Sequence, residues 1–270
     1  MKKNPSLAAS GIIAGYDKKV ILNHVDVAIP SNRISVIIGA NACGKSTLLK
    51  TLARLIKPTG GQVLLDGRQI HEIPPKKLAQ TLGLLPQSPV VPEGITVSDL
   101  VSRGRFPYQS FLKGMDKQDG EAVEEALDIM GITALANRSV DELSGGQRQR
   151  VWIAMALAQH TDILLLDEPT TFLDIAYQIE ILDLLTDLNR KRGTTIVMVL
   201  HDINHAARYA DHIFAVQQGN LVAQGTPAQI ITEELIKRVF GLDCVVIRDP
   251  VSDTPFLVPM GRYHTAGRGM

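Results

Sequence analysis

The sequence is poor in several features that would point to particular classes of protein. Only two cysteines occur in 270 residues, Cys43 and Cys244, and they lie too far apart for the spacing of a metal site. This excludes a disulfide framework and fits a reducing compartment. Aromatic residues make up 4% of the chain, and 28 basic residues balance 28 acidic ones. Few stacking platforms and no basic surplus argue against a nucleic acid partner.

Long apolar runs are also missing. The longest, residues 162–169 (DILLLDEP) and 194–202 (TTIVMVLHD), are short and bounded by charge. A membrane-spanning helix needs roughly 18 or more apolar residues, so none is expected. The first ten residues, MKKNPSLAAS, hold no apolar stretch typical of a signal peptide. We therefore expect a chain that is soluble by itself, in which the two runs form buried parallel strands.

What the sequence does contain is an alternation of strand and helix patterns. Residues 33–56 are typical of a strand, a loop and a helix, and strand-like runs recur at 163–167 and 195–201. Residues 6–30 are rich in β-forming pieces, and from about 88 to 160 the pattern becomes helical. We predict an α/β fold with a parallel-sheet core, an antiparallel β subdomain and an inserted α-helical subdomain at about 88–160. A chain that is 45% apolar can bury one substantial core, or one core with a smaller satellite. We predict that residues 1–270 form a single domain.

Local signals predict individual elements. The Asp66–Gly67 dipeptide favours a tight hairpin turn. Residues 212–225 and 244–260 are typical of two further strand pairs. Apolar residues at helical spacing predict one helix from Val123, Leu127 and Met130, and another from Ile181, Leu184, Leu185 and Leu188.

A phosphate-binding loop is predicted at GANACGKST. The segment fits G-x-x-x-x-G-K-[ST] between an apolar strand and a helix. In that context backbone N–H groups wrap a β-phosphate, Lys45 reaches the β and γ oxygens, and Ser46 ligates Mg²⁺. An ordinary glycine turn with a surface lysine is the alternative. The predicted binding residues are Gly39, Ala40, Asn41, Ala42, Cys43, Gly44, Lys45, Ser46 and Thr47.

Two carboxylates follow the apolar run ILLLD and complete this prediction. Asp167, at the tip of a strand beside the loop, is placed to hold Mg²⁺ through its water. Glu168 is placed to orient or deprotonate an attacking water. The alternative is a pair of solvated loop carboxylates, which Pro169 disfavours because it stiffens the turn after them.

A second anion site is predicted at LSGGQ, residues 143–147, which opens a long helix. The free N–H groups and positive dipole end of a helix attract phosphate, and glycine lets it approach closely. Since one nucleotide needs only one β/γ cradle, a second one makes sense if two chains close over each other's nucleotide.

Taken in order, these motifs resemble those of ATP-binding cassette (ABC) ATPases. The matching segments are GANACGKS, LLPQ at 84–87, LSGGQRQR, ILLLDEPT, Leu173–Asp174 and His201, and they span nearly the whole chain. The resemblance implies a P-loop NTPase (RecA-like) fold, with ATP and Mg²⁺ as cofactors. It also implies a homodimer whose two chains sandwich two ATP molecules head to tail. Ser144, Gly145, Gly146 and Gln147 would then bind the partner's ATP.

The resemblance assigns roles to further residues. Tyr16 resembles the aromatic residue that stacks on adenine, although a packing tyrosine is the alternative. Gln87 resembles the glutamine that reaches Mg²⁺ and water and signals to the membrane subunit, with an ordinary loop glutamine as the alternative. Asp174 resembles the aspartate that communicates across the dimer, and a helix N-cap explains it equally well. His201 resembles the histidine that contacts the γ-phosphate and keeps the catalytic geometry with Glu168.

Two details depart from simple expectations. His201 and His205 have the i, i+4 spacing of a zinc pair, but His201 ends a predicted strand and no third ligand is evident. The family usually has glycine where Ala42 stands and often proline at Ala40. If position 42 needs a left-handed backbone, alanine there costs on the order of 1–2 kcal/mol, whereas Ala40 is expected to be harmless.

Finer likeness points to import. Residues 95–114, 124–159, 170–189 and 249–262 resemble the ATPase subunits of bacterial ferric-siderophore importers. This implies two separate integral-membrane permease subunits, indirectly a substrate-binding protein, and a peripheral location at the cytoplasmic face of the inner membrane. The basic and aromatic stretch 103–111 would otherwise suggest an RNA or lipid surface, but its place after Gln87 puts it near the cleft for a permease helix, with a solvated loop as the alternative. Importers of haem or cobalamin, a non-transport ABC ATPase and a P-loop kinase are the alternatives.

Overall fold

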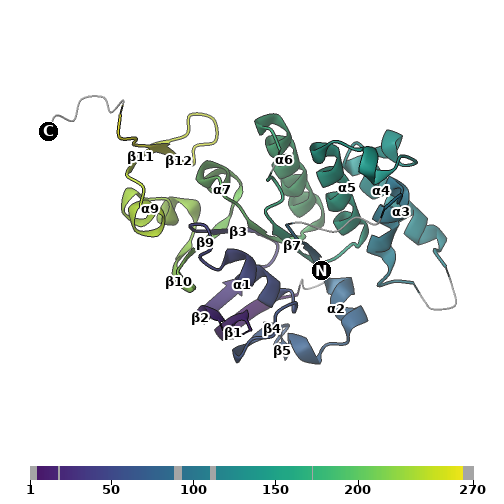
Figure 1. Ribbon diagram of the computed structural model, residues 1–270, viewed down its shortest axis with the longest axis horizontal. Helices are drawn as coiled ribbons and strands as arrows, with labels where there is room; N and C mark the ends of the chain where they lie inside the picture. The colour runs from purple at the N-terminus through teal and green to yellow at the C-terminus, as the bar shows by residue number, and fades with distance from the viewer. Residues whose placement is uncertain (1–4, 18, 88–92, 110–113, 172, 264–270) are drawn as a thin grey trace.

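The core of the protein is a largely parallel sheet. The computed structural model describes residues 5–17, 19–87, 93–109, 114–171 and 173–263, in which three sheets are found (Figure 1). The central sheet has the order β10-β9-β3-β8-β7-β6, in which only β9 and β10 pair antiparallel. Every residue of β3, β7 and β8 is buried, as expected for parallel strands covered on both faces. The strands are β3 (Ile34–Ile38), β6 (Leu82–Leu85), β7 (Ile163–Asp167), β8 (Thr195–Val199), β9 (His212–Gln217) and β10 (Asn220–Gly225).

The predicted antiparallel part is a second sheet with the order β2-β1-β4-β5. Its strands are β1 (Leu7–Tyr16), β2 (Lys19–Ile29), β4 (Gly60–Leu65) and β5 (Arg68–Gln69). The turn between β4 and β5 has φ of 52° at Asp66 and 75° at Gly67. Positive φ at both central residues is the geometry that a two-residue hairpin turn requires, so this prediction is confirmed.

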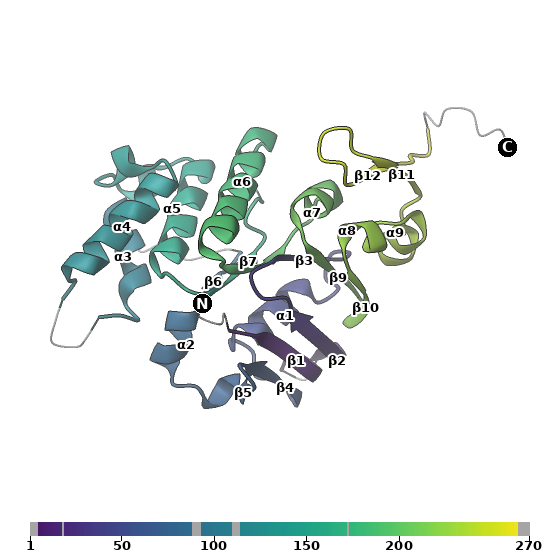
Figure 2. The same cartoon turned by 180° about the vertical axis from the view of Figure 1, so that it is seen from behind.

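Helix α1 (Lys45–Leu52) lies between the two sheets (Figure 2). Leu48 of α1 belongs to one buried cluster with Ile12 of β1 and Ile37 of β3. Burial on both sides fixes the start of α1, and therefore the loop that precedes it, relative to both sheets. The 3₁₀ turn η1 (Ile70–Glu72) and α2 (Pro75–Thr81) then lead back to β6.

The inserted helical part of the predicted fold is present in the structure. It contains α3 (Val97–Ser102), α4 (Lys117–Ile129) and α5 (Gly145–Ala158), with the 3₁₀ turns η2 (Arg103–Arg105), η3 (Thr133–Leu135) and η4 (Val140–Glu142). Val123, Leu127 and Met130 are buried, as their spacing predicted. Residues 88–92 and 110–113 lie outside the described residues.

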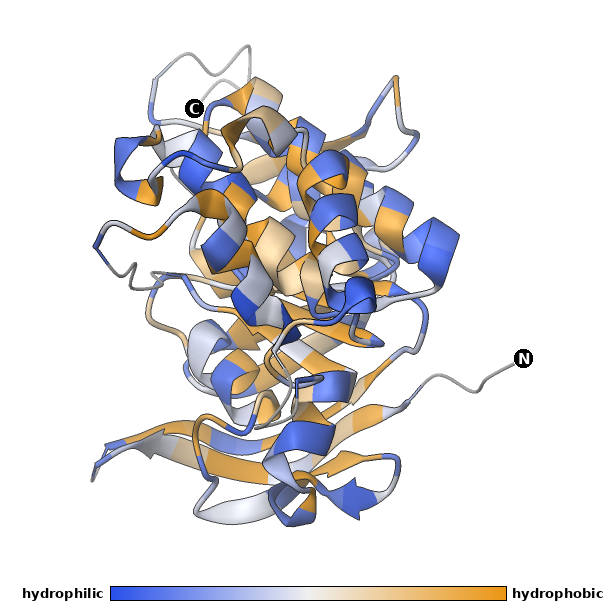
Figure 3. Cartoon of the chain, turned by 90° about the vertical axis from the view of Figure 1, so that its right-hand side faces the viewer, coloured by the Kyte–Doolittle hydropathy of each residue, from blue (hydrophilic) through white to orange (hydrophobic). Residues whose placement is uncertain are grey.

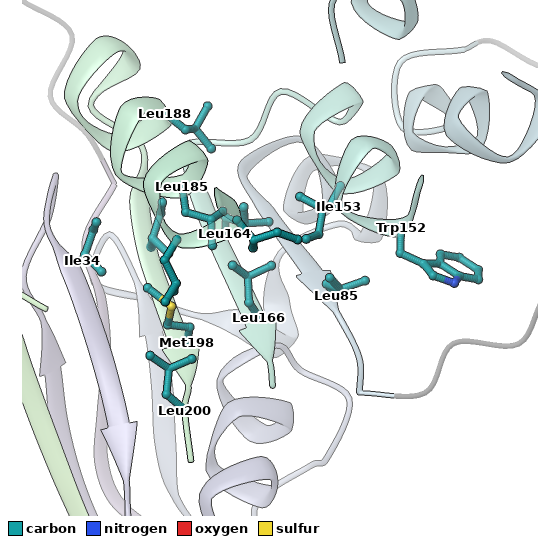
Figure 4. Close-up of a cluster of buried hydrophobic side chains, with 14 of the residues drawn as sticks. Ile34, Leu85, Trp152, Ile153, Leu164, Leu166, Leu185, Leu188, Met198 and Leu200 are labelled. Atoms are coloured by element: carbon teal, nitrogen blue, oxygen red, sulfur yellow. The ribbon is translucent and has the colours of Figure 1, made fainter. Parts of the chain in front are cut away.

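The other face of the central sheet packs against α5 and α6 (Ile175–Arg192). Figure 4 shows Ile153 of α5 and Leu185 of α6 meeting Leu164 and Met198 from the sheet. Of the four apolar residues predicted for α6, Leu184 is partly buried and the others are buried, so that face is confirmed. In Figure 3 the strands of the antiparallel sheet alternate between orange and blue or white, and the helices are also of mixed colour.

The last two strands of the described chain form a hairpin that packs against the helices preceding it. Helices α7 (Ile203–Tyr209), α8 (Pro227–Ile230) and α9 (Glu233–Phe240) precede it, and the hairpin pairs β11 (Cys244–Arg248) with β12 (Pro255–Pro259), confirming the predicted terminal pairing. Cys43 and Cys244 are both free and buried. None of the helices in the described ranges is long and apolar enough to cross a membrane.

Candidate active site

The loop from β3 to α1 has the backbone that a phosphate-binding loop needs. At Gly39 a Cβ would lie 2.2 Å from the carbonyl oxygen of Val216, so only glycine fits there. Gly44, with φ of 112°, caps the N-terminus of α1, which begins at Lys45. Lys45 is buried, and its Nζ donates to the carbonyl oxygens of Gly39 (2.8 Å) and Ala40 (2.9 Å). The lysine ammonium is therefore held at the loop, at the helix end where anions bind.

Position 42 has the left-handed backbone that was considered for it in the sequence. Its φ is 59°, in the left-handed region, and its side chain is exposed. Ala40 does not have a positive φ. The strain therefore falls on position 42 and not on position 40.

A cleft of about 480 Å³ opens at this loop. It brings together residues from five places in the sequence. Four of these places belong to the predicted motifs, and the fifth, Lys19 and Ile21, was not predicted. Its lining residues are Lys19, Ile21, Asn41, Ala42, Cys43, Gly44, Lys45, Ser46, Thr47, Gln87, Glu168 and His201. Burial raises the pKa of the Cys43 thiol, which keeps it protonated at neutral pH.

Ser46 and Asp167 form the part of the site that suits a divalent cation. Ser46 Oγ donates to Asp167 Oδ1 at 2.9 Å. The other carboxylate oxygen, Oδ2, is buried and has no hydrogen-bond partner within the described part of the chain. Burial raises the pKa of Asp167, because the ionised form loses solvation that nothing on Oδ2 replaces. A hydroxyl and a carboxylate are hard oxygen ligands, so these residues fit Mg²⁺.

Glu168 is the most connected acidic residue of the site. Its side chain is 8% exposed. Oε2 accepts from Gln87 Nε2 at 2.6 Å and from Thr171 Oγ1 at 3.1 Å, while His201 Nε2 lies 2.6 Å from Oε1. Its backbone φ is 56°, a conformation that costs a non-glycine residue about 1–2 kcal/mol. Strain of this kind persists where surrounding contacts enforce it, and such positions cluster at functional sites.

Some of this site could not be found from the motifs. Thr171 and the cleft residues Lys19 and Ile21 were not predicted. Thr171 had one usable signal, since a hydroxyl three residues after a carboxylate can reach it across a turn. Tyr16 is 48% exposed at the end of β1, paired with Lys19 in the hairpin, and it does not line the cleft. Its stacking on adenine remains a prediction.

The signature segment lies at a separate cleft. Ser144 caps α5: its Oγ accepts from Gln147 N (3.3 Å), and Gln147 Oε1 accepts from Ser144 N (3.1 Å). A Cβ at Gly145 would meet nothing within 4 Å, so its backbone is open to an approaching group. A cleft of about 360 Å³ here is lined by Gly131, Ile132, Leu135, Ser144, Gly146, Gln147, Arg150, Leu173, Asp174 and Tyr177. The two clefts share no residue.

Two alternatives from the sequence can be examined geometrically. Asp174 caps α6, and its Oδ1 accepts from Tyr177 N at 3.0 Å, so the capping interpretation is correct whatever else the residue does. His201 precedes α7, whereas His205 lies within it, so the pair is not carried by one helix. No cluster of three metal-ligating side chains occurs in the portion of the chain described.

A glycine-rich loop joining a buried parallel strand to a helix, with an aspartate at the tip of a neighbouring strand, defines a P-loop nucleotide-binding protein. Residues 22–171 match the ABC transporter family model. The chain belongs to this family, and its activity is that of an ABC transporter ATPase.

Relatives extend the match over nearly the whole chain. Over 256 residues it is 52% identical to the ferric enterobactin transport ATP-binding protein FepC of Escherichia coli, covering 95% of this chain and 94% of that one. It superposes on a metal-chelate-type ABC transporter in an inward-facing conformation with a TM-score of 0.83, at 29% identity over 96% of this chain and 99% of that chain. The dimeric bacterial ABC transporter cassette MJ0796 gives a TM-score of 0.73 at 29% identity, over 82% of this chain and 98% of that chain.

Proposed function

We propose that this chain is the ATP-hydrolysing subunit of a bacterial importer of ferric siderophores. The observation that carries the proposal is the 52% identity to a ferric enterobactin transport protein, which extends over 95% of the chain rather than over the shared motifs alone. The site supports the ATP-hydrolysing part of the proposal, because a phosphate loop, a cation site and a buried carboxylate lie together at one cleft.

The working unit in this proposal is a homodimer. Separate phosphate-loop and signature clefts on one chain support it, since Ser144 and Gly146 do not line the cleft that holds Lys45. In a head-to-tail pair each signature would close over the partner's cleft. Asp174, at the rim of the signature cleft, would communicate between the two chains.

The proposed chemistry follows from the geometry. Lys45 and the N-terminus of α1 would neutralise charge on the terminal phosphates, with Ser144 and Gly146 of the partner subunit adding donors from the other side. Ser46, Asp167 and Gln87 would hold Mg²⁺, which offsets phosphate charge when bound. Glu168 would orient the attacking water and accept its proton, while His201 keeps the Glu168 carboxylate in place.

ATP binding drives transport by shifting the equilibrium between the open and the closed dimer. ATP binds the closed dimer more tightly than the open one, and this difference drives closure, while hydrolysis removes it. We propose that two integral-membrane permease subunits receive the closure at the cytoplasmic face of the inner membrane, where the chain is peripheral. A substrate-binding protein would act indirectly through the permease. Residues 1–270 form a single ATP-binding domain in this view, with about 88–160 as its helical subdomain.

The proposal is tested by co-purification and transport. The tagged chain is isolated from detergent-solubilised native membranes, and its co-purified permease is reconstituted into proteoliposomes. We expect ATP-dependent uptake of iron-labelled siderophore, with no comparable uptake of haem or cobalamin. Uptake of haem or cobalamin instead would correct the cargo, and recovery of ribosomal or DNA-associated partners alone would refute transport.

A further inference from the structure

The histidine of the active site is attached to a very short helix. His201 lies two residues before α7, and Asp202 between them caps that helix by accepting from His205 N at 2.8 Å. Any shift or rotation of α7 therefore moves the imidazole that lies 2.6 Å from Glu168 Oε1. A helix of seven residues is too short to hold its own conformation, so its position depends on what it packs against.

The C-terminal hairpin holds α7 through a two-bond clamp. Asn204 Oδ1 accepts from the backbone N of Leu257 at 2.7 Å, and Asn204 Nδ2 donates to the carbonyl oxygen of the same residue at 3.1 Å. Leu257 is itself buried in β12. Two bonds to one backbone unit fix both the distance and the orientation between α7 and the hairpin, as a pair of bonds in a strand ladder does.

An ion pair forms a second link one turn further along α7. Arg208 pairs with Asp249, which is buried in the loop between β11 and β12. The Arg208 guanidinium holds the pKa of Asp249 well below its usual range, and so do hydrogen bonds from Val251 N and Ser252 Oγ. The loop is thus folded around a carboxylate that α7 neutralises. Figures 1 and 2 show the hairpin beside α7, at the end of the molecule away from α3 and α4.

We propose that Asn204 and Arg208 are positioning residues, and that the hairpin formed by β11, β12 and their loop is a brace that holds His201 against Glu168. The inference rests on the proposed role of His201, and it places two positioning contacts outside both clefts. It assigns a function in turnover to the two hairpin residues that α7 contacts, Leu257 and Asp249.

The brace acts through orientation, which sets the size of the effect. The 2.6 Å contact between His201 Nε2 and Glu168 Oε1 leaves hydrogen-bonding range when the two atoms separate by about 1 Å, and misplacement of that order costs catalysis up to about 100-fold. Partial loosening of α7 should cost about 3- to 10-fold in kcat. The KM for ATP should stay within about twofold, because Asn204 and Arg208 do not line the cleft at the phosphate loop.

The test uses the full chain and compares alanine substitutions at two arginines, Arg208 and Arg248, and two substitutions of different severity at Asn204. Asn204→Ala removes both clamp bonds, Asn204→Asp keeps only the acceptor, and Arg208→Ala breaks the link to the loop. Arg248→Ala is the control, because Arg248 pairs with Asp253 inside the hairpin and both side chains are exposed. Thermal unfolding confirms that each variant is folded at the assay temperature.

Expected results are a 3- to 10-fold fall in kcat for Asn204→Ala and Arg208→Ala, a smaller fall for Asn204→Asp, and no change for Arg248→Ala. In a His201→Gln background, single-turnover rates should fall less than twofold further when Asn204→Ala is added. An unchanged kcat, an equal effect of Arg248→Ala, or losses that multiply fully in the double variant would overturn the brace.

A spectroscopic readout separates this inference from the proposed function. With ring-labelled histidine, the NMR signal lost in His201→Gln identifies His201, and it should shift in Asn204→Ala and Arg208→Ala but not in Arg248→Ala. An unmoved signal refutes the brace even in an active enzyme. A shifted signal in a protein whose His201→Gln variant hydrolyses ATP normally supports the brace and refutes the role of His201.

Discussion

Replacing Ala42 with glycine removes a methyl group from a backbone position that favours glycine. The φ of 59° costs alanine about 1–2 kcal/mol. Glycine relieves this cost but increases the conformational freedom of the unfolded chain, which takes back about 0.4–1 kcal/mol. Because the side chain is exposed, no packing is lost. The expected net gain in the free energy of unfolding is roughly 1 kcal/mol.

The nearby Ala40 provides a control, because the same substitution there should change the free energy of unfolding in the opposite direction. Ala40 does not have a positive φ, so Ala40→Gly relieves nothing and should destabilise by about 0.4–1 kcal/mol. In urea unfolding without nucleotide, Ala42→Gly should raise the midpoint and Ala40→Gly should lower it. By thermal unfolding, the Ala42→Gly gain corresponds to a rise in Tm of about 2–4 °C.

The same substitution bounds the effect of Ala42 on nucleotide binding. Even if all the relieved strain, about 1–2 kcal/mol, reached the ATP-bound state alone, the dissociation constant would change by only about 5- to 30-fold. Titration calorimetry with ATP measures this directly. If Ala42→Gly destabilises the protein as much as Ala40→Gly does, the left-handed backbone is not a cost in the folded protein and the reasoning fails.

Three further substitutions test the interior of the site and its surroundings. Thr171→Val removes a hydroxyl that donates to Glu168 and should lower kcat about 3- to 10-fold, with Thr171→Ser restoring it in steady-state assays; wild-type kcat in the valine variant would contradict this. Asp167→Asn should abolish turnover yet stabilise the ligand-free protein at neutral pH by about 1 kcal/mol. Burial raises the pKa of Asp167 in the folded protein, so the cost of burying its ionised form disappears as the pH falls. In thermal melts from pH 8 to pH 4, the stability gained by Asp167→Asn should therefore shrink. A gain that stays constant would contradict burial of the charged carboxylate as its cause. Arg105→Ala leaves Asp119 buried without its partner and should cost about 3–5 kcal/mol in urea unfolding, partly recovered by adding Asp119→Asn; a loss below 1 kcal/mol would be inconsistent with that pair.

Local patterns in the sequence were enough to predict most elements of the fold. Buried parallel strands read as continuous apolar runs, and the Asp66–Gly67 turn carries its own geometry, so both could be identified without knowledge of distant contacts. Position 42 was identified differently, through the resemblance to ABC ATPases, which usually have glycine there, and its φ of 59° is the left-handed backbone that this glycine suggested.

Features that depend on distant pairings could not be predicted. Gln87 donates to a carboxylate 81 residues away, and Asn204 pairs with a backbone unit 53 residues away. The stretch 103–111 was singled out for its basic and aromatic side chains, but its sequence did not show that Arg105 is buried against Asp119, with its guanidinium 3.9 Å from the centre of the Tyr108 ring. Single residues carry no signal for such contacts, since only the completed fold brings their partners together.

The measurement that tests the central claim most directly is the oligomeric state and turnover of Glu168→Gln with Mg²⁺ and ATP. Light scattering after gel filtration should show a dimer that retains ATP, together with steady-state hydrolysis at least 100-fold below that of the wild type. Without nucleotide the same variant should be a monomer. Near-normal hydrolysis by a chain that stays monomeric with ATP would contradict both the role of Glu168 and the two-chain site.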